Sequence, residues 1–565
     1  MPWTLWRHVT GDLLKLVLIS TGVLVLVIAF AAAIKPLADG VLRPAAALGF
    51  MAFATVPMMA YALPFAAAFG AAMAYHRMAQ DNEVVAALAG GVPHRVLLVP
   101  ALVCGAVLAV GLGALNDRVI PTFLQRMEQM VTLDAVDMLV RQLDQGQSAE
   151  LGQMIVDAES VHTVDVPADS GAVKALRLLR VTALELDASG GVLDDATAAG
   201  AWVSLWPGEQ VGLDDGSLVG RMQLERASLS SEGSVSNAGV FNTPLFRVPN
   251  AFSDDPKFLT GDELEALRDE PERMGFIRPH HTRLARAIAL AGVGERLDAD
   301  IRETGAIRLD GSVGTLSVRA SGVEGAGPWR FVPEDEAGGV EITLRRMGGD
   351  DTLRLVADEA ELRAEPAEGP TGGGITSAAG PAAPGGLRFV LDLRGVRLSS
   401  AGGGVQTDRG EQSYSGLALR DGVLNELRAL PSGELMARAR RAVEAGGPGA
   451  AGTASIESAR RTLEENIDEL GREVTSKQHE RMAMAAVCPV MVLLGAITAL
   501  RLRHAMPLAV YLWSFFPALG AVIMIAVGQE AIHDNGASGI PVIWSGVVAL
   551  GVAAAVGVVR LKRVS

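Results

Sequence analysis

The stretch HRMAQDNEVVAALAGGVPHR, residues 76–95, is a polar interruption between two long apolar runs. It contains the signals that begin a helix. Asp81 or Asn82 is placed to cap the N-terminus, because short polar side chains accept hydrogen bonds from the free amide groups of a first turn. Glu83 adds negative charge to that turn, where the helix dipole favours it. These residues predict a short helix over 81–91.

The same stretch predicts where this helix ends and which of its apolar residues share a face. Gly90, Gly91 and Pro93 follow the apolar residues, and such residues are typical just beyond a helix. By the 3.6-residue period, three apolar residues share one face: Val84, Ala87 and Leu88. A short helix of this kind, acidic at its start, is suited to engage a partner protein. The alternative is a connecting helix that buries a few apolar residues and binds nothing.

Apolar residues are concentrated towards the two ends of the chain. Of its 565 residues 49% are hydrophobic, and the mean hydropathy is +0.30. Six runs reach the length of about 20 residues that a bilayer core requires of a helix: 16–34, 48–75, 96–115, 482–500, 506–527 and 540–559. The pattern predicts an α-helical membrane protein with three spans on each side of a large central domain. Both cysteines, Cys104 and Cys488, lie inside these runs, so no disulfide framework is available to the middle of the chain.

Basic residues in the short segments orient the predicted spans. If the six runs alternate in direction, four basic segments share one side: Arg7; Arg77 and Arg95; Arg501 and Arg503; and Arg560, Lys562 and Arg563. By the positive-inside rule this side is cytoplasmic. Both termini and the helix at 81–91 are then cytoplasmic, and the region 116–481 lies on the opposite side. The predicted division is therefore 1–115, 116–481 and 482–565.

A secretory signal peptide is an alternative explanation of the N-terminus. Arg7, His8 and Lys15 precede an apolar run, as basic residues do in such peptides. The run at 16–34 is longer than the roughly 7–15 residues of a signal core, which favours a retained span. Sequencing the N-terminus of the mature protein distinguishes the two.

The central region is acidic. Of the chain's 49 basic and 64 acidic residues, 38 and 58 lie in 116–481, a net charge of −20. Such a surface repels polyanions, which argues against nucleic acid as a partner. It also argues against this region holding an anionic ligand by its overall charge.

Period-two alternation predicts that the central region is mainly β-structure. Apolar and polar residues alternate in many short segments bounded by Gly and Asp turns: 176–186, 202–206, 218–224, 307–318, 340–345, 353–355 and 387–393. This spacing is typical of a β-sandwich or jelly roll. Residues 261–297 have a helical pattern and indicate an inserted subdomain. Gly- and Pro-rich loops are predicted at 369–386 and 445–455, and a charged helix over 459–477 leads into the fourth span.

Catalytic motifs are missing from the sequence. There is no phosphate-binding G-x-x-x-x-G-K-[ST] loop, no G-x-S-x-G elbow and no H-E-x-x-H helix. The pair His280-His281 has no third ligand at a suitable spacing and is interpreted as a solvated surface pair. The sequence therefore predicts no enzyme, no metal site and no cofactor of its own, so work on the membrane would need a bound motor.

The arrangement of these segments resembles the LptF/LptG permease family of the lipopolysaccharide exporter. Three spans, a large β region and three more spans, with the pattern E-x-x-x-x-x-A-x-G-x at 83–92, carry the resemblance. Weaker similarities are IKPLADG at 34–40, Pro57 and Pro64, QHER at 478–481 and GIP at 539–541. The region 116–481 is much longer than the single compact jelly roll of that family, so insertions are expected there.

The resemblance implies a function and a set of partners. Family members are inner-membrane permease subunits that pair as heterodimers of two such permeases above a dimeric cytoplasmic ABC ATPase. They extract lipopolysaccharide from the outer leaflet and pass it to a periplasmic bridge of the LptC/LptA type. ATP is used by the ATPase, and the permease needs no cofactor. The helix near Glu83 would then contact the ATPase, with five residues in the predicted coupling site: Glu83, Val84, Ala87, Leu88 and Gly90.

Two basic residues on the outer side are candidates for the lipid. Lys35 closes the first span where the positive-inside rule least expects a cation, and a lysine at this point faces the lipid cavity in the family resembled. Its ammonium could meet a lipid phosphate, with Arg43 as a second candidate. The alternative role is an interfacial anchor. For the whole chain, the alternatives are a permease for another lipid or for mechanical work, and a non-transporting binding scaffold.

Overall fold

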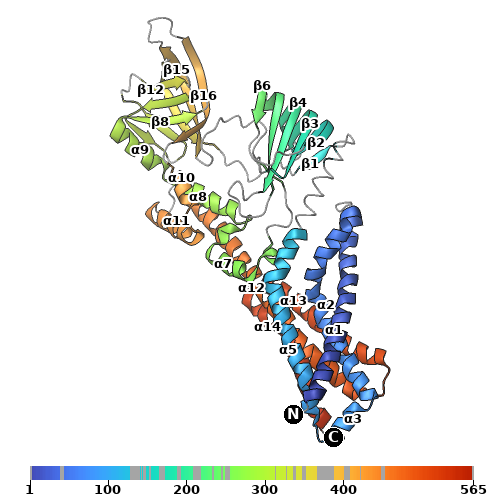
Figure 1. Cartoon of the computed structure of the whole chain (residues 1–565). Coiled ribbons are helices and arrows are strands. Elements are labelled where there is room, and N and C mark those ends of the chain that lie inside the picture. Colours follow the sequence, from blue (N-terminus) through green and yellow to red (C-terminus); the bar gives the residue numbers. More distant parts are fainter. Residues whose placement is uncertain are drawn as a thin grey trace. The chain divides into compact units, whose positions relative to one another are not determined.

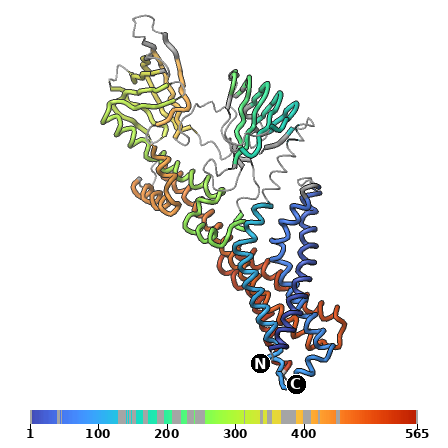
Figure 2. The backbone as a smooth tube through the Cα atoms, viewed as in Figure 1, coloured from blue at the N-terminus to red at the C-terminus, as the bar shows by residue number. Residues whose placement is uncertain are grey.

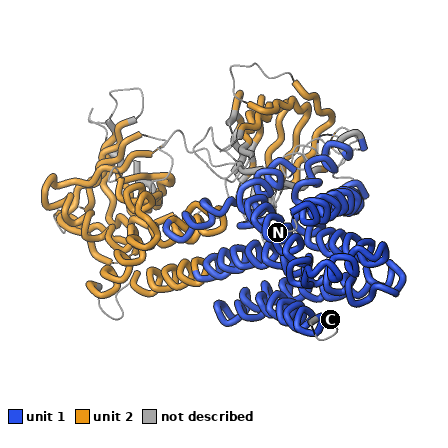
Figure 3. Tube along the Cα trace, turned by 60° about the horizontal axis from the view of Figure 1, so that its bottom comes forward, with its two compact units in different colours: residues 1–142, 250–269, 468–565 blue, residues 143–249, 270–467 orange. Residues whose placement is uncertain are grey.

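The computed structural model places the chain in two compact units (Figure 3). The helical unit comprises residues 1–142, 250–269 and 468–565, and the β unit comprises 143–249 and 270–467. Figure 2 follows the backbone through both. The described residues are 3–38, 44–127, 140, 143, 148–151, 154–164, 172–186, 192–207, 218–231, 234–242, 246–248, 255–311, 314–325, 327–334, 339–346, 352–365, 387–399, 407–419, 422–446 and 452–562.

Long helices form most of the helical unit (Figure 1). The N-terminal set is α1 (Trp3–Ala38), α2 (Pro44–Gln80), α3 (Glu83–Ala89), α4 (His94–Leu97), α5 (Val99–Ala114) and the π-helix η1 (Leu115–Val119). The C-terminal set is α12 (Thr453–Arg501), α13 (Pro507–Asn535), the short η6 (Gly536–Gly539) and α14 (Ile540–Lys562). Two short elements complete the unit, η4 (Pro256–Phe258) and α7 (Gly261–Asp269). All six predicted apolar runs fall within helices.

Within the described residues, five helical stretches are long and apolar enough to cross a membrane: Trp3–Ala38, Ala47–Gln80, His94–Met127, Thr453–Arg501 and Pro507–Leu561. The last of them contains both α13 and α14, which are separated by η6. The structure therefore confirms an α-helical membrane protein with a β-rich region. The predicted six spans require α13 and α14 to be two separate spans, which length and composition alone do not test.

Helix α12 lies at the centre of the helical unit. The most apolar part of α12 is 67% buried, whereas that of α1 is 28% buried. Glycines allow its neighbours to come close: a Cβ on Gly105 of α5 would lie 2.5 Å from the Pro489 Cα, and one on Gly495 would lie 2.5 Å from the Ala68 carbonyl oxygen of α2. Small residues at such crossings are how membrane helices gain packing contacts.

The basic segments meet at one end of the helices. Leu5, Val84, Leu502 and Leu561, which belong to these four segments or flank them, pack in one buried cluster. Both ends of the chain and α3 lie at this same end in Figure 1. The two chain ends and α3 thus lie at the same end of the helical unit, where alternating spans would place them.

Sheet A, residues 149–248, is an antiparallel sheet whose first six strands pair in sequence order. Its strands are β1 (Ala149–Leu151), β2 (Met154–Val164), β3 (Lys174–Leu186), β4 (Val192–Pro207), β5 (Leu218–Ser231), β6 (Ser234–Asn242) and β7 (Phe246–Val248), the last paired with β5. The predicted alternation is present but changes phase in mid-strand: β3 buries Leu176 and Leu178, then Val181 and Ala183. The phase changes at Arg180, which has φ 46° and no partner in the ladders to β2 and β4. The pairing register with β2 and β4 is the same before and after Arg180, so the change of buried face occurs without an extra residue in β3.

Sheet B, residues 306–419, has nine strands and closes on itself. They are β8 (Ala306–Gly311), β9 (Gly314–Arg319), β10 (Gly322–Glu324), β11 (Trp329–Val332), β12 (Val340–Arg346), β13 (Thr352–Ala357), β14 (Glu359–Ala364), β15 (Arg388–Ser399) and β16 (Thr407–Leu419). Because β16 pairs with both β8 and β15, the order β15-β13-β12-β9-β8-β16 forms a ring. A closed ring removes sheet edges. Two separate sheets were not foreseen, and the described strands do not confirm a jelly roll.

Helices separate the two sheets in the sequence. The helical pattern predicted for 261–297 corresponds to α7, η5 (Pro271–Arg273), α8 (Arg278–Ala291) and α9 (Val293–Thr304). The interpretation of His280-His281 as a solvated pair is wrong for His281, whose residue is 3% exposed. Its Nε2 donates to the Leu430 carbonyl oxygen at 2.9 Å, and burial lowers its pKa. The helical period places His281 on the buried face of α8, which sequence spacing alone could have indicated.

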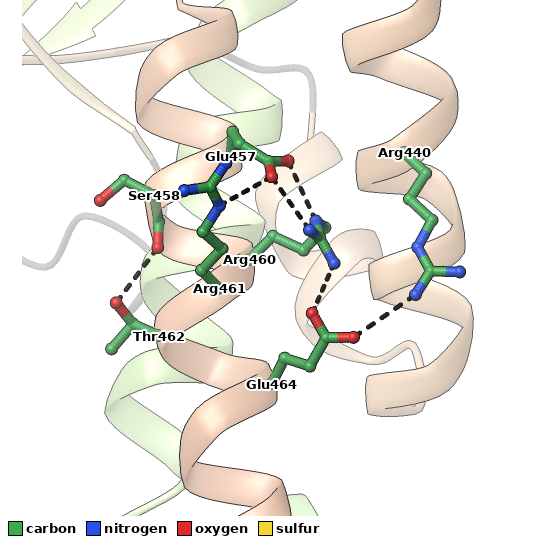
Figure 4. Close-up of polar contacts among 7 residues, drawn as sticks. All are labelled: Arg440, Glu457, Ser458, Arg460, Arg461, Thr462 and Glu464. Carbon is green, nitrogen blue, oxygen red and sulfur yellow. Dashed lines mark hydrogen bonds and ion pairs between the residues drawn. The ribbon is translucent and has the colours of Figure 1, made fainter.

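Two further helices follow sheet B, α10 (Val423–Arg428) and α11 (Ser432–Gly446), before α12 begins. Figure 4 shows how α11 and α12 are joined by charge. Arg460 donates to Glu457 and to Glu464, and Arg440 of α11 lies 3.6 Å from the Glu464 carboxylate. Hydrogen bonds from Arg460 and Arg461 lower the pKa of Glu457 to about 2. The predicted loop at 369–386 and residues 447–451 of that at 445–455 lie outside the described residues, and α11 and α12 extend into the two ends of the second loop.

Candidate functional site

Helix α3 begins without the predicted side-chain cap. Asn82 is the N-cap residue, but it has the left-handed φ of 59° and its side chain makes no capping bond. Asp81 forms an ion pair with Arg77 at 3.9 Å instead. The cap prediction is therefore wrong, because the left-handed residue reverses the chain sharply after α2 and turns both side chains away from the first turn. The predicted end is confirmed, since Gly90 closes the helix and Gly91 has φ 82°.

The apolar face of α3 packs against its own chain. Val84 is 8% exposed and belongs to the cluster that joins the ends of the helices, and Ala87 and Leu88 pack partly against it. The opposite face is open: Val85 is 47% exposed, and Ala86, Ala89 and Gly90 are exposed. Of the five predicted coupling residues, Gly90 therefore lies on the accessible side, and Glu83 is partly exposed at the start of the helix. Val84, Ala87 and Leu88 hold the helix in place.

Two buried hydrogen bonds fix the segment that follows α3. The Tyr75 hydroxyl donates to the Leu97 carbonyl oxygen at 2.7 Å, and the Trp6 Nε1 donates to the Val96 carbonyl oxygen at 3.1 Å. These bonds join α4 to α2 and α1. The segment after α3 is thus tied to α1 and α2 through α4, and the packing of Val84 in the buried cluster holds α3 itself in a fixed place.

Glu83 is unpaired. It is partly exposed and makes no side-chain hydrogen bond or ion pair with any residue that the structure describes. A carboxylate at the first turn of a helix is favoured by the dipole, but only by about 0.3–1 kcal/mol. Its acceptor capacity remains available to another molecule.

Lys35 is also unpaired. It lies in the last turn of α1, is exposed, and has no ion-pair partner among the described residues. Pro36 follows it inside the helix and interrupts the backbone hydrogen bonding there. Arg43, the second lipid candidate, lies outside the described residues. The two predicted lipid ligands are therefore not brought together by anything that the structure describes.

The described residues contain no group of three or more His, Cys, Asp or Glu side chains that could hold a metal ion. Cys104 and Cys488 are buried and free.

A cluster of polar side chains lies farther along the helices. Part of it, QHER at 478–481, was noted in the sequence only as a weak family similarity. We call the cluster the polar joint, and it consists of Asn116, Lys257, Leu259, Arg268, Gln478, His479, Arg481 and Trp544. Three neighbouring residues of α12 bond to three other elements: Gln478 accepts from Arg268 of α7, His479 accepts from Trp544 of α14, and Arg481 donates to the end of η4. The sequence signal was the density of polar residues just before the fourth apolar run.

Residues 7–166 match the sequence profile of the family described as "Lipopolysaccharide export system permease LptF/LptG". No curated protein matches the chain. The matched segment runs from α1 into β2 and includes Lys35 and Glu83. The resemblance seen in the sequence is confirmed, whereas sheet B, α12, α13 and α14 lie beyond the match.

Proposed function

We propose that this chain, which belongs to the LptF/LptG permease family by its residues 7–166, is a permease subunit of an ABC-type lipopolysaccharide exporter. The family makes it a transport subunit in a membrane. The observation that carries the finer proposal is the fixed, open face of α3 with an unpaired Glu83. A site of this kind, on a chain without a nucleotide-binding motif, fits a separate motor protein.

The proposed motor is a dimeric cytoplasmic ABC ATPase, and α3 is its docking helix. The basic segments that gather at the α3 end support a cytoplasmic location, because positively charged loops are retained on that side. Both termini are then cytoplasmic, and the six apolar runs are six spans in a 3+3 arrangement. The sheets lie in the periplasm, and the membrane is the bacterial inner membrane.

The remaining partners follow from the same proposal. A second LptF/LptG-type permease completes a heterodimer, and the exposed apolar side chains of α1, α5 and α13 supply surface for it or for lipid: Leu18 is 70% exposed, Val110 74% and Trp513 69%. A periplasmic bridge protein of the LptC/LptA type receives the lipid. The chain itself uses no cofactor.

The substrate is proposed to meet Lys35 first. A phosphate is a hydrogen-bond acceptor with full negative charge, and an exposed ammonium at the end of α1 offers up to three donors. Arg43, five residues beyond the described end of α1, is the second proposed ligand. The lipid would be extracted from the outer leaflet of the inner membrane at this level.

Co-purification from native membranes tests the proposal. The chain should recover a second permease of similar size, an ATPase and bound lipopolysaccharide, identified by mass spectrometry. Recovery of another lipid with the ATPase would indicate a different exporter. Recovery of neither ATPase nor lipid would favour a membrane-anchored scaffold and reject the proposal.

Topology is tested separately. Compartment-sensitive reporters fused at Gly373 and at Ser565 should report the periplasm and the cytoplasm, respectively. Periplasmic activity at Ser565 would reject the six-span arrangement.

A further inference from the structure

In the polar joint, one turn of α12 makes hydrogen bonds to several distant parts of the chain. Its residues Gln478, His479 and Arg481 on α12 bond to residues that are 65 to 365 positions away in the sequence, as the pairs of His479 with Trp544 and of Arg481 with Asn116 show. Side chains on one exposed helical turn usually contact solvent or their own helix. Glu480 behaves in that way, since it pairs with Lys477 of α12 at 3.3 Å. Its three neighbours do not.

Arg481 is the centre of the joint. Its Nη2 donates to the Leu259 carbonyl oxygen at 2.7 Å and to the Lys257 carbonyl oxygen at 3.3 Å. These carbonyls lie at the end of η4, where helical groups lack partners within the helix. The Arg481 carbonyl oxygen in turn accepts from the buried Asn116 at 3.4 Å. One residue therefore ties α12 to both η4 and η1.

Helix α7 is held at both ends. At its start, the Thr260 backbone amide and hydroxyl donate to the Glu263 carboxylate at 2.7 and 2.9 Å, and the Glu263 amide donates back to the hydroxyl at 3.4 Å. This reciprocal arrangement is a capping box. At its end, Arg268 donates to Gln478 at 2.9 Å. The capping box orders the start of this nine-residue helix, and the bond from Arg268 joins its end to α12.

The joint also includes a π-helical turn. Asn116 lies in η1, the π-helix that continues α5, and Gln125 beyond it donates to the Phe258 carbonyl oxygen at 3.0 Å. Wide turns of this type are rare and are found mostly at functional sites. Gln125, in the helix that continues α5, therefore bonds to the same short segment, 256–259, as Arg481 of α12.

We propose that the polar joint couples movement of the membrane helices to the segment 255–269, and that Gln478 and Arg481 are its positioning residues. The inference rests on the proposed function, in which an ATPase moves these helices. Helix α12 is about 73 Å long at 1.5 Å per residue and continues through Pro489 over its 49 residues, so it connects the joint to the other end of the span at Arg501. The joint then fixes α7 to it during the whole cycle.

The coupling ratio, lipid released per ATP hydrolysed by the reconstituted exporter, tests the joint. Gln478→Leu removes the acceptor for Arg268 and should lower the ratio about tenfold, because a hydrogen bond to a charged group is lost. Gln478→Glu keeps an acceptor and should restore the ratio. Thr475→Val, one turn away, removes only a bond within α12 and is the matched control. A purely structural role would lower release and hydrolysis together and leave the ratio unchanged.

A cross-link tests whether the joint stays closed. In a background with Cys104→Ala and Cys488→Ala, the pair Arg268→Cys and Gln478→Cys should be uncoupled when free and recover coupling when joined by a bismaleimide. Loss of release on joining would show that α7 leaves α12 during the cycle, which contradicts the inference.

The outcomes separate this inference from the proposed function. If the wild-type exporter releases no lipid, the proposed function is wrong and the inference falls with it. If the wild type releases lipid and Gln478→Leu keeps the wild-type ratio, only the inference is wrong.

Discussion

Helix α3 and the polar joint lie at opposite ends of α5. They differ in whether their polar side chains bond to the rest of the chain. About 26 Å of helix separates Val99 from Asn116 at 1.5 Å per residue. Glu83 of α3 makes no bond to the described part of the chain, whereas Gln478, His479 and Arg481 of the joint are all bonded to other elements. Unpaired polar groups on a fixed support are available to a partner. Paired groups between distant segments connect the chain to itself.

The difference divides residues into two classes that experiments can distinguish. Changes at unpaired groups, Glu83 and Lys35, should leave the isolated chain intact and appear only when a partner or lipid is present. Changes at paired groups should be measurable in the chain alone. The comparison would be wrong if a change at an unpaired group altered the isolated chain, or if a change at a paired group had an effect only with a partner present.

The largest effect is expected at Lys35. Lys35→Glu should abolish extraction of lipopolysaccharide from reconstituted vesicles, because a carboxylate repels the lipid phosphates, and Lys35→Arg should largely retain it. Insertion and ATPase binding should be normal in both variants. Lys35→Gln decides between ligand and anchor, and release by this variant at the wild-type rate would make Lys35 an interfacial anchor only.

A smaller effect is expected at Glu83. Glu83→Ala should weaken ATPase binding by about 2–5 kcal/mol if a partner charge is left buried, and by at most about 1 kcal/mol if Glu83 only favours its helix. Titration of the ATPase onto the purified permease measures the change. Asp81→Ala is the matched control, since Asp81 is a nearby carboxylate already paired with Arg77. Equal affinities of wild type and Glu83→Ala would remove the docking role.

Asn116 should behave as a paired residue. Asn116→Leu removes the donor to the Arg481 carbonyl oxygen and should lower the free energy of unfolding of the chain by about 1 kcal/mol without any partner. Thermal unfolding in detergent measures this loss. A stability equal to that of the wild type, with an effect only in the assembled exporter, would place Asn116 in the unpaired class.

The smallest effect is a pH dependence at Glu457. Its folded pKa of about 2 is below the ordinary value of 4.5, so its ion pairs stabilise the protein above about pH 4.5 and lose this contribution as the pH falls towards 2. Exposure of the Arg461 side chain, at 68%, keeps its share of the effect small. Unfolding temperatures measured from pH 6 to pH 3 should fall less steeply for Glu457→Gln than for the wild type. Parallel curves would show that these pairs contribute nothing.

Local signals predicted α3 and the strands well, because they depend on neighbouring residues. The glycines at 90–91 ended α3 as expected, and the alternation at 387–393 placed Phe389, Leu391 and Leu393 in the core. The change of buried face at Arg180 was missed, since it depends on the backbone conformation of one residue within ladders whose register does not change.

Long-range features could not be derived from the sequence alone. Closure of sheet B depends on β16 pairing with β8, about a hundred residues earlier, and nothing in either strand specifies that partner. The joint was missed for a similar reason: Arg481 binds backbone carbonyl oxygens, which every residue has, at 222 and 224 positions away. For the candidate site, the sequence identified Glu83 and Lys35 but not that Val84, Ala87 and Leu88 face inward.

ATP-driven release of lipopolysaccharide is the most direct test of a permease that is driven through α3. Vesicles containing the complex purified through this chain should release lipopolysaccharide to an added acceptor when ATP is present, and should not do so with a non-hydrolysable analogue. Glu83→Ala should reduce that release while leaving the chain folded and inserted. Release with ATP that does not exceed release from protein-free vesicles would contradict the account.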